Sequence, residues 1–494
     1  MKNKTAVIIG AGLGGLSIAC LLAQKGYKVT VLEKNSHAGG RINTFKSKGF
    51  LFDLGPSFYQ MPSVFEDFFK KFNKNIHDYF KLKRLNPSYR MFFGRKDKID
   101  ISSNLKDNVK LFESYEKGAG QKLKEFLAQA KYQYDTSMNY FLYKEYKTIF
   151  DFFSWKMIKE GYRLHVFDNM DKFTSRFFKN DRLIKILQYT LVFLGGSPKH
   201  TPAIYSLMAH VDFNLGVWYP MGGMSKLSES MKDLAISLGV KFKFNEPASK
   251  ILVKDNKATS VKSSKSTYLA DVVVANADYY HVEKKLLDET YKNYNEKYWD
   301  NKTVAPSAFI IVLGLNKKIK SFSHHNFLLE NDWMEHFDQI FEDPKWPDNP
   351  SIYICAPSVS DPSVAPEGHE NLFILVPVAS NLKDTPQIRN KFYKLVIKAI
   401  EHTIGENIED SILVKKIFAH NDFKEIYNAY KGTALGLSHT LMQTAFFRPS
   451  HTNKKIANLY YTGHYTHPGI GMPIQFISSQ IVSDLIEKNE QTAH

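Results

Sequence analysis

The sequence predicts an α/β fold whose first 33 residues form a dinucleotide-binding βαβ unit. An apolar run over residues 5–9 is typical of a buried strand and leads directly into a glycine-rich turn over residues 10–15. A helical stretch follows, and a second apolar strand over residues 28–32 ends on the acid Glu33, 23 residues after Gly10. This order of strand, turn, helix, strand and acid indicates a Rossmann-like domain more strongly than a glycine motif alone.

The glycines of this turn have expected roles in holding the pyrophosphate of a dinucleotide. Gly10 allows the tight turn, Gly12 lets the phosphates approach the backbone, and Gly15 lets the helix pack closely on the strand. The free N–H groups at the start of the helix and the positive end of its dipole then face the phosphates. Glu33 is expected to accept hydrogen bonds from a ribose hydroxyl.

Length, charge and cysteine content limit the class of protein. A chain of 494 residues exceeds one core, so two domains are expected. Cys20 and Cys355 give no disulfide framework, and because no zinc-ligand spacing is present, no metal is expected. The net charge of +16 favours a polyanionic partner. No nucleic-acid module is recognisable, so the expected partner is an anionic membrane surface rather than a nucleic acid.

The apolar segments favour a cytoplasmic protein. The first apolar run is interrupted by glycines, and no small-residue cleavage site follows it, so we interpret it as structure and not as a secretory signal. No window reaches the roughly 18 to 20 consecutive apolar residues of a membrane span. The expected location is therefore the cytoplasm.

Two further segments narrow the choice of nucleotide. Gly39-Gly40-Arg41 combines glycines, which let the backbone pass close to a ligand, with a planar guanidinium that can hold a phosphate. Asp53-x-Gly55-Pro56-Ser57 follows a short apolar run. The combination resembles the FAD-binding start of the flavin amine oxidase and carotenoid desaturase superfamily. The resemblance implies FAD and not NAD.

Two distant parts of the chain support the same cofactor. Residues 219–225 open an amphipathic helix, and a strand pair containing Ala248 and a strand ending at Asn276 follow it. Near the C-terminus a strand over residues 458–463 runs into a glycine- and proline-rich loop, and a helix is expected from about residue 475 to 486. The amides at the start of that helix can face a flavin ring or a phosphate.

Over nearly its whole length the chain resembles the bacterial and fungal-type carotenoid (phytoene) desaturases. The motifs that carry this resemblance are Gly10 to Gly15, Gly39-Gly40-Arg41, Phe52-Asp53-x-Gly55-Pro56, Leu194-Gly195-Gly196-x-Pro198, Thr201-Pro202-Ala203, Tyr219-Pro220-x-Gly222-Gly223-Met224, Asn276-Ala277-Asp278, Gln443-Thr444-Ala445-x-x-Arg448-Pro449 and Gly463 to Pro473. The resemblance implies FAD contacts at Gly10, Gly12, Gly14, Gly15, Glu33, Lys34, Gly40, Arg41, Gly55, Pro56, Ser57, Ala248, Asn276, Gly463, Gly471, Met472 and Pro473.

The positions of these motifs imply two domains, each assembled from separate parts of the chain. A Rossmann-like, discontinuous FAD-binding domain and a mixed α+β substrate-binding domain are expected, the first from residues 1–85, 215–280 and 455–494 and the second from residues 86–214 and 281–454. The first block of the substrate domain is mostly helical by pattern. The second contains strand-like runs over residues 308–315 and 372–378.

Residues 140–178 are rich in aromatic side chains that alternate with cations. The cations are Lys144, Lys147, Lys156, Lys159 and Arg163. Such a composition is typical of a helix that lies in a membrane interface, although a core helix with a solvated basic face has the same pattern. A carotenoid substrate resides in the bilayer, so the resemblance favours peripheral contact with the cytoplasmic side of a membrane.

The implied reaction is the introduction of a C=C bond into a long polyene. No side chain has a pKa near that of an alkane C–H, so the reaction requires a hydride acceptor such as a flavin, and few essential acids or bases are expected. His467 is the candidate catalytic residue, as a polar group near the flavin, and Arg448 and Asp278 are further candidates with an equally plausible structural role. The expected electron acceptor is a quinone or oxygen.

The terminal loop departs from the family pattern. It carries His464, Tyr465 and His467 where many phytoene desaturases are less polar. A polar pocket favours a carotenoid with an oxygenated end, so 3,4-desaturation of a 1-hydroxy carotenoid is expected slightly ahead of phytoene desaturation. The two histidines could equally contact backbone or flavin oxygens. The alternatives to a desaturase are a flavin amine oxidase, a relative of carotenoid isomerase or retinol saturase, and a non-catalytic carotenoid or flavin carrier.

Overall fold

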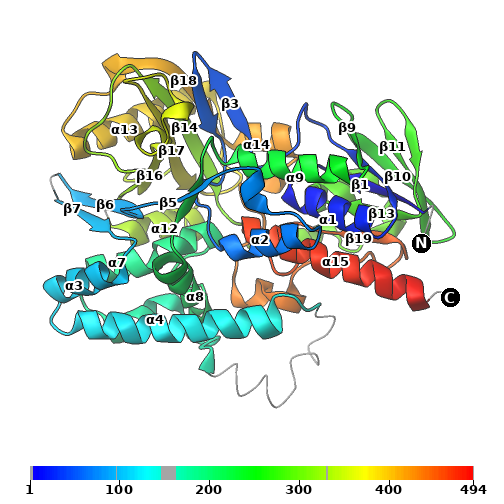
Figure 1. The fold of residues 1–494 in the computed structure, drawn as a ribbon, viewed down its shortest axis with the longest axis horizontal. Helices are drawn as coiled ribbons and strands as arrows, with labels where there is room; N and C mark the ends of the chain where they lie inside the picture. Colours follow the sequence, from blue (N-terminus) through cyan, green and yellow to red (C-terminus); the bar gives the residue numbers. More distant parts are fainter. Residues whose placement is uncertain (1–3, 96, 146–162, 330–331, 493–494) are drawn as a thin grey trace.

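Two large sheets organise the molecule. The structure, a computed structural model, describes residues 4–95, 97–145, 163–329 and 332–492. One sheet lies at the right of Figure 1 and the other at the upper left, with a group of helices below the second. This mixture of a parallel sheet, a largely antiparallel sheet and helices is the α/β class that the sequence predicts.

The first sheet is parallel, with strand order β19-β13-β1-β2-β9. Its strands come from three distant parts of the chain and are β1 (Thr5–Ile9), β2 (Lys28–Leu32), β9 (Lys241–Lys243), β13 (Val272–Ala275) and β19 (Leu459–Tyr461). In the two central strands Val7 pairs with Val273, and both side chains are buried. Such continuous apolar strands are typical of a parallel sheet that is covered on both faces.

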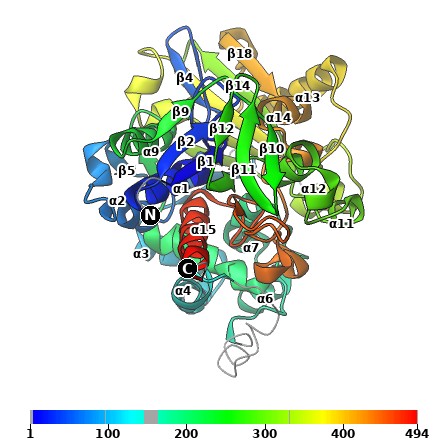
Figure 2. The ribbon, with the colours of Figure 1, turned by 90° about the vertical axis from the view of Figure 1, so that its right-hand side faces the viewer.

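Helices cover one face of this sheet and a smaller sheet covers the other. The helices are α1 (Leu13–Gln24), α9 (Ser225–Ser237) and α15 (Met472–Thr492), and α1 packs between the other two. The small antiparallel sheet is β10 (Ala248–Lys254), β11 (Lys257–Ser263) and β12 (Thr267–Leu269), seen in front of β1 in Figure 2. Its Ile251 and Val261 share a core with Val7 and Val273 of the first sheet.

The second sheet has seven strands in the order β18-β14-β17-β16-β15-β6-β7, antiparallel except where β15 meets β6. The strands are β6 (Tyr89–Gly94), β7 (Asp97–Ile101), β14 (Ser307–Leu315), β15 (His325–Leu328), β16 (Ile352–Cys355), β17 (Glu370–Val378) and β18 (Ile412–Phe418). β14 is wholly buried, because Phe309 and Ile311 pack against α13 (Pro386–Ile404) while Ile310 and Val312 face the opposite core.

Helices of the first half of the chain, together with α12, enclose that opposite core. They are α3 (Leu105–Tyr115), α4 (Ala119–Thr136), α6 (Met170–Phe177), α7 (Asp181–Gln188), α8 (Leu207–His210) and α12 (Trp333–Phe341). The remaining strands and α-helices are β3 (Thr44–Ser47), β4 (Phe50–Asp53), α2 (Pro62–Lys70), β5 (Leu82–Arg84), β8 (Trp218–Pro220), α10 (Tyr279–His281), α11 (Glu296–Asp300) and α14 (His420–Tyr427). The expected strands over residues 308–315 and 372–378 are confirmed by β14 and β17.

The last helix differs from its expected bounds. It begins at Met472 and continues to Thr492, so it is longer at both ends than the predicted residues 475–486. The helix can begin early because Gly471, with φ +128°, provides the turn before it, and Pro473 occupies the first turn, where a missing N–H is tolerated. Within the described ranges, we find no helix that is both long enough and apolar enough to span a bilayer.

Candidate functional site

One cavity of about 1190 Å³ joins the glycine turn after β1 to the apolar side chains beneath the second sheet. Its volume exceeds the roughly 300 to 1,000 Å³ of an ordinary ligand pocket, so a dinucleotide and a second ligand can share it. The predicted cofactor contacts that line it are Gly10, Gly12, Gly14, Glu33, Lys34, Gly40, Arg41, Gly55, Pro56, Ser57, Ala248, Asn276, Gly471, Met472 and Pro473.

Gly15 and Gly463 do not line the cavity and have packing roles instead. A Cβ at Gly15 would lie 2.0 Å from the carbonyl oxygen of Gly10, so only glycine lets α1 sit this close to β1. Gly463 follows β19 with φ +125°, a backbone conformation that favours glycine. Both residues therefore support the site from behind its surface.

Three segments that are far apart in the sequence meet at the glycine turn. The Gly10 N–H donates to Leu32 O at 2.8 Å, and the Gly39 N–H donates to Ala11 O at 2.9 Å. A Cβ at Gly40 would lie 3.0 Å from Gly12 Cα, so these two backbones are in contact. The amide of Asn276 lies against the same turn, because a Cβ at Gly14 would be 2.4 Å from its Oδ1. The glycines therefore let these backbones pack in contact, and the close approach of a phosphate to them stays a prediction.

Glu33 holds the turn through its carboxylate. The Ala11 N–H donates to Oε2 and the Asn35 N–H donates to Oε1, each at 2.8 Å, and the side chain is buried. Each carboxylate oxygen can accept a further hydrogen bond. The arrangement is compatible with the predicted ribose contact, which stays a prediction.

Arg41 supplies a positive charge inside the cavity wall. Its guanidinium carbon lies 5.4 Å from the centre of the Tyr427 ring, and its Nε and Nη2 are buried without a hydrogen-bond partner among the described residues. A buried guanidinium with unused donors is unfavourable unless an anion pairs with it. A diphosphate beside the glycine turn would supply that anion, so the residues present fit a flavin dinucleotide.

Burial keeps His467, the candidate catalytic residue, neutral. Its Nε2 lies 3.2 Å from the carbonyl oxygen of Phe141, which can only accept, so Nε2 carries the proton. Burial lowers the pKa of His467 to about 3. His467 lines the cavity as an uncharged imidazole at neutral pH, together with His464, whose pKa burial holds well below its usual value.

Asp278 and Arg448, the two further candidates, each organise loops around the site. Asp278 accepts hydrogen bonds from the Tyr465 hydroxyl at 2.6 Å, the His281 N–H at 3.1 Å and the Tyr430 N–H at 3.2 Å. Burial raises the pKa of its carboxyl group. These contacts make Asp278 the link between the end of β13 and the terminal loop.

The guanidinium of Arg448 is buried and donates to four backbone carbonyls at 2.8 to 3.1 Å, those of Leu437, Gln443, His464 and Tyr465. Burial lowers its pKa only to about 10, so the group remains charged at neutral pH. Arg448 is absent from the cavity lining, and it joins the 437–443 loop to the terminal loop. The structure therefore supports a structural role for Arg448 and not a role in the chemistry.

We expect Arg448→Met to destabilise the protein by at least about 3 kcal/mol, because it leaves several buried carbonyls without donors. Urea unfolding followed by circular dichroism measures the change. The control is Arg84→Met, since Arg84 is exposed, and its effect should stay within about 1 kcal/mol. Equal losses of stability in the two variants would contradict the structural role of Arg448.

A hydrogen-bonded pair that sequence reasoning missed also lines the cavity. The Ile470 N–H donates to His439 Nε2 at 3.1 Å, so Nδ1 carries the imidazole proton and donates to the Tyr205 hydroxyl at 2.6 Å. Burial lowers the pKa of His439 well below its usual value. Residues 205 and 439 belong to no common motif, so no local pattern could have joined them.

Beyond the glycine turn the cavity becomes an apolar chamber. Its side chains come from the helical group and from the second sheet, and include Val192, Phe193, Ile204, Met208, Phe327, Trp333, Phe337, Ile340 and Leu375. The carboxylates in the lining are Glu33 and Asp278, both beside the glycine turn and both hydrogen bonded. The chamber therefore suits a long hydrocarbon and offers no described carboxylate to an ammonium group.

Known proteins resemble the chain over its whole length. The family model described as flavin containing amine oxidoreductase matches residues 13–486. A carotenoid 3,4-desaturase of Haloarcula japonica is 42% identical over 487 residues, which cover 98% of each chain. A zeta-carotene-forming phytoene desaturase of Myxococcus xanthus is 31% identical over 490 residues, covering 98% of this chain and 94% of that protein.

Solved structures share the fold at low identity. An oxidoreductase from Methanosarcina mazei superposes with a TM-score of 0.64 at 16% identity, covering 97% of this chain and all of that one. A putrescine oxidase superposes with the same TM-score of 0.64 at 11% identity, covering 99% of each chain. The chain belongs to the flavin-containing amine oxidoreductase family and, within it, to the carotenoid desaturases, as the sequence resemblance implied.

Proposed function

We propose that the protein is an FAD-dependent desaturase that introduces a C=C bond into a carotenoid, with 3,4-desaturation of a 1-hydroxy carotenoid favoured over the steps that begin from phytoene. The observation that carries the proposal is the continuous cavity, which joins a dinucleotide turn to a long apolar chamber. The 42% identity with a carotenoid 3,4-desaturase supports the same reaction. The absence of a carboxylate from the described chamber disfavours the amine oxidase alternative.

The protein's part in this reaction is to bind, orient and exclude water. Gly12, Gly40 and Arg41 would hold the diphosphate of FAD, and Glu33 would hold a ribose hydroxyl. When bound, FAD supplies the hydride acceptor. The aromatic and aliphatic side chains of the chamber would place one C–C bond of the polyene beside the cofactor and keep water away. A quinone or oxygen is the proposed final electron acceptor.

One polar atom in the lining supports an oxygenated substrate. His464 Nε2 is buried and has no hydrogen-bond partner in the described ranges, and the ring lines the cavity. A buried polar atom left unpaired costs about 1 to 3 kcal/mol, so a hydroxyl group on the substrate would be a favourable partner. A flavin oxygen is the alternative partner. His464→Phe should lower the flavin content if the imidazole contacts the flavin. It should instead reduce the preference for a hydroxylated substrate if the imidazole contacts the substrate hydroxyl.

Expression in bacteria that accumulate defined carotenoids tests the proposed function. A host that makes 1-hydroxy carotenoids should gain a pigment with a longer chromophore, because each desaturation extends the conjugated system. The alternatives predict other outcomes. An isomerase would change the pigment without lengthening the chromophore, and a carrier would leave the pigments unchanged.

We also propose that the protein lies peripherally on the cytoplasmic face of a membrane, from which the substrate enters the cavity. Phe167 is 84% exposed and Leu441 is 42% exposed, yet both line the cavity, so they lie at its mouth. Met442, beside Leu441, is 61% exposed. Lys144 and Arg163 of the basic aromatic stretch are described, whereas Lys147, Lys156 and Lys159 lie outside the described residues.

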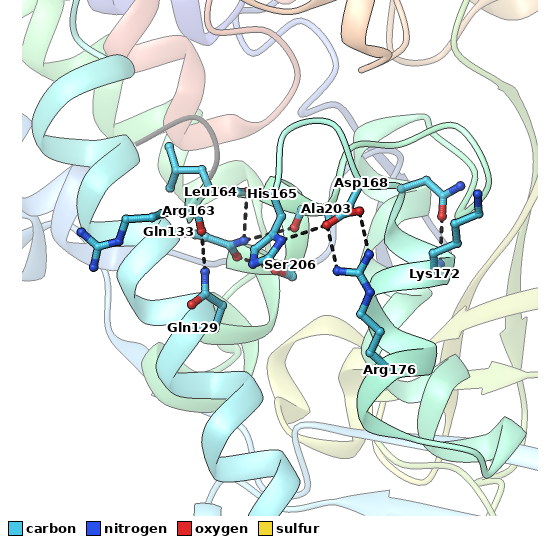
Figure 3. Close-up of polar contacts among 11 residues, drawn as sticks. Gln129, Gln133, Arg163, Leu164, His165, Asp168, Lys172, Arg176, Ala203 and Ser206 are labelled. Carbon is cyan, nitrogen blue, oxygen red and sulfur yellow. Dashed lines mark hydrogen bonds and ion pairs between the residues drawn. The ribbon is translucent and has the colours of Figure 1, made fainter. Parts of the chain in front are cut away.

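Polar contacts hold the segment that carries Phe167 against α4 and α6 (Figure 3). Gln129 and the buried Gln133 donate to the carbonyl oxygens of Arg163 and Leu164 at 2.9 and 3.2 Å. Asp168 accepts from Arg176 at 2.8 and 2.9 Å and lies 2.9 Å from His165 Nδ1. The Arg176 contact is the main reason that the pKa of Asp168 is lowered. The exposed ring of Phe167 therefore projects from a well-anchored loop.

We expect the double variant Phe167→Asp, Met442→Asp to bind vesicles of anionic lipid much less than the unmodified protein in a sedimentation assay. The substitutions remove apolar surface from the interface and add charges that anionic lipids repel. Leu269→Asp is the matched control, because Leu269 is 76% exposed but does not line the cavity. If the control and the double variant lose binding equally, the mouth of the cavity is not the membrane contact.

A further inference from the structure

A second group of chemically reactive side chains lies behind the cavity wall. His325 on β15 pairs with Cys355 on β16 in the antiparallel register, and His324 directly precedes β15. One ligand atom of each of the three residues lies within 4.8 Å of the others. All three side chains are buried, with exposures of 2%, 0% and 4% for His324, His325 and Cys355. Sequence spacing did not reveal this cluster, because two chain segments contribute to it.

The imidazoles of this cluster have unused hydrogen-bonding atoms. Both ring nitrogens of His324 and Nε2 of His325 are buried without a partner among the residues described. Nδ1 of His325 lies 2.7 Å from the Tyr353 hydroxyl, which fixes the orientation of the ring. Buried polar atoms almost always have partners, so three orphaned nitrogens in one place indicate that a further group belongs there.

We propose that His324, His325 and Cys355 bind a divalent metal ion, with Zn²⁺ as the ion that suits this donor set. Two neutral imidazoles and one thiolate are common zinc ligands, and a partner on the other nitrogen of a ligating histidine, such as Tyr353, is a usual feature of such sites. Binding replaces the thiol proton of Cys355 with the metal and releases that proton to solvent, without a change of oxidation state.

A small separate cavity beside Cys355 has room for one water molecule. It measures about 10 Å³ and is lined by Cys355, Asp53 and Tyr219. This is about the volume that one water molecule requires. Asp53 Oδ1 and the Tyr219 hydroxyl are buried and lack partners in the described part of the chain, so both can hydrogen bond to that water.

The position of the site gives the ion a structural role. The Tyr353 hydroxyl also lies 2.6 Å from Ser57 Oγ, and the ring of Phe58 stacks on His325 with centroids 4.0 Å apart. Ser57 follows Gly55 and Pro56, and all three line the main cavity. The ion would therefore fix β15 and β16 against the segment that borders the cofactor.

Metal analysis of the full-length protein, purified with its flavin and without chelators, tests the proposal. We expect about one zinc ion per chain in the unmodified protein, and at least a fivefold loss in Cys355→Ser and in His324→Ala. Cys20→Ser is the matched control, because Cys20 is the other cysteine, equally buried but on α1. It should keep the metal.

Replacement of zinc by cobalt keeps the test informative if a variant fails to fold. A thiolate–cobalt charge-transfer band is expected in the unmodified protein and in Cys20→Ser. Exposure to a chelator should abolish the band in the otherwise folded protein. Absence of both zinc and the band from the unmodified protein would overturn the proposal, as would a folded Cys355→Ser that retains the metal. Ordered water would then be the partner of the orphaned nitrogens.

Discussion

Gly12→Val is expected to purify as a folded protein that has lost its flavin. Gly12 has φ −71°, so its backbone tolerates a side chain. Its Cβ would lie 3.0 Å from Asn276 Nδ2 and 3.9 Å from Gly40 Cα, and the valine methyl groups would enter the cavity that Gly12 and Arg41 both line. That space is where the diphosphate approaches the backbone, so a branched side chain excludes it. The ratio of flavin to protein absorbance measures the loss, and acid extraction identifies the released flavin as FAD.

Two further glycine variants separate loss of cofactor from loss of fold. Gly239→Asn is the control, because Gly239 has φ +85° with no atom near its Cβ position, and asparagine tolerates that conformation. It should keep its flavin. Gly15→Val should fail to fold, since its Cβ would lie 2.0 Å from Gly10 O. If Gly12→Val retains flavin at the level of the unmodified protein, the turn does not hold the diphosphate.

The protein is expected to lose stability steeply as the pH falls from 7 to 5. Burial lowers the pKa values of His281, His336 and His451 to about 4 and that of His467 to about 3. The unfolded chain protonates these groups below about pH 6.5 while the folded chain does not, so each removes up to about 1.4 kcal/mol of stability per pH unit in this window. Outside the His324–His325 pair, the pKa values of four other described histidines, His210, His420, His439 and His464, are also lowered.

Buried carboxyl groups act in the opposite direction. Burial raises the pKa values of Asp278 and Glu283, and it raises those of Asp53 and Asp212 to about 7. Between about pH 4 and 7 the unfolded chain ionises these groups while the folded chain keeps them protonated, so they favour the folded state as the pH falls. They are outnumbered by the histidines, and the net loss should be several kcal/mol between pH 7 and 5.

Denaturant unfolding at several pH values measures this pH dependence of stability. One histidine variant tests whether buried histidines cause it. Burial holds His336 neutral. Its Nε2–H donates to Pro377 O at 2.8 Å, and its Nδ1 accepts from the Ser351 N–H at 3.1 Å. His336→Gln should reduce the slope by about 1.4 kcal/mol per pH unit. A stability that does not change between pH 7 and 5 would contradict the assignment of neutral buried histidines.

The sequence predicts those parts of the site that depend on local backbone requirements. The βαβ unit, the paired glycines before Arg41 and the turn before α15 each need a particular dihedral angle or a close approach, and such needs leave a local pattern. Asp53 shows the limit of this reasoning. The sequence marks its motif, but it does not reveal that the Asp53 side chain accepts the Met224 N–H at 2.9 Å near the start of α9, 171 residues away. The motif that contains Asp53 and the motif that contains Met224 thus contact each other in the fold.

Contacts between residues that are far apart in the sequence leave no such local pattern. Arg448 was a candidate for chemistry because a charged residue in a motif has the same sequence signature whether it meets a ligand or four carbonyls. His439 with Tyr205, and His324 and His325 with Cys355, come together only through the packing of separate elements. Their roles follow from burial and hydrogen bonding, which the order of residues does not encode.

Anaerobic incubation of the purified, flavin-loaded protein with one substrate at a time, in vesicles, tests the account most directly. A 1-hydroxy carotenoid should bleach the flavin absorbance and shift the polyene absorbance to longer wavelength, and phytoene should do so more slowly. Conversion of phytoene without action on the hydroxylated carotenoid would contradict the substrate preference alone. If neither carotenoid reacts and a simple amine bleaches the flavin, the proposed desaturase function is wrong.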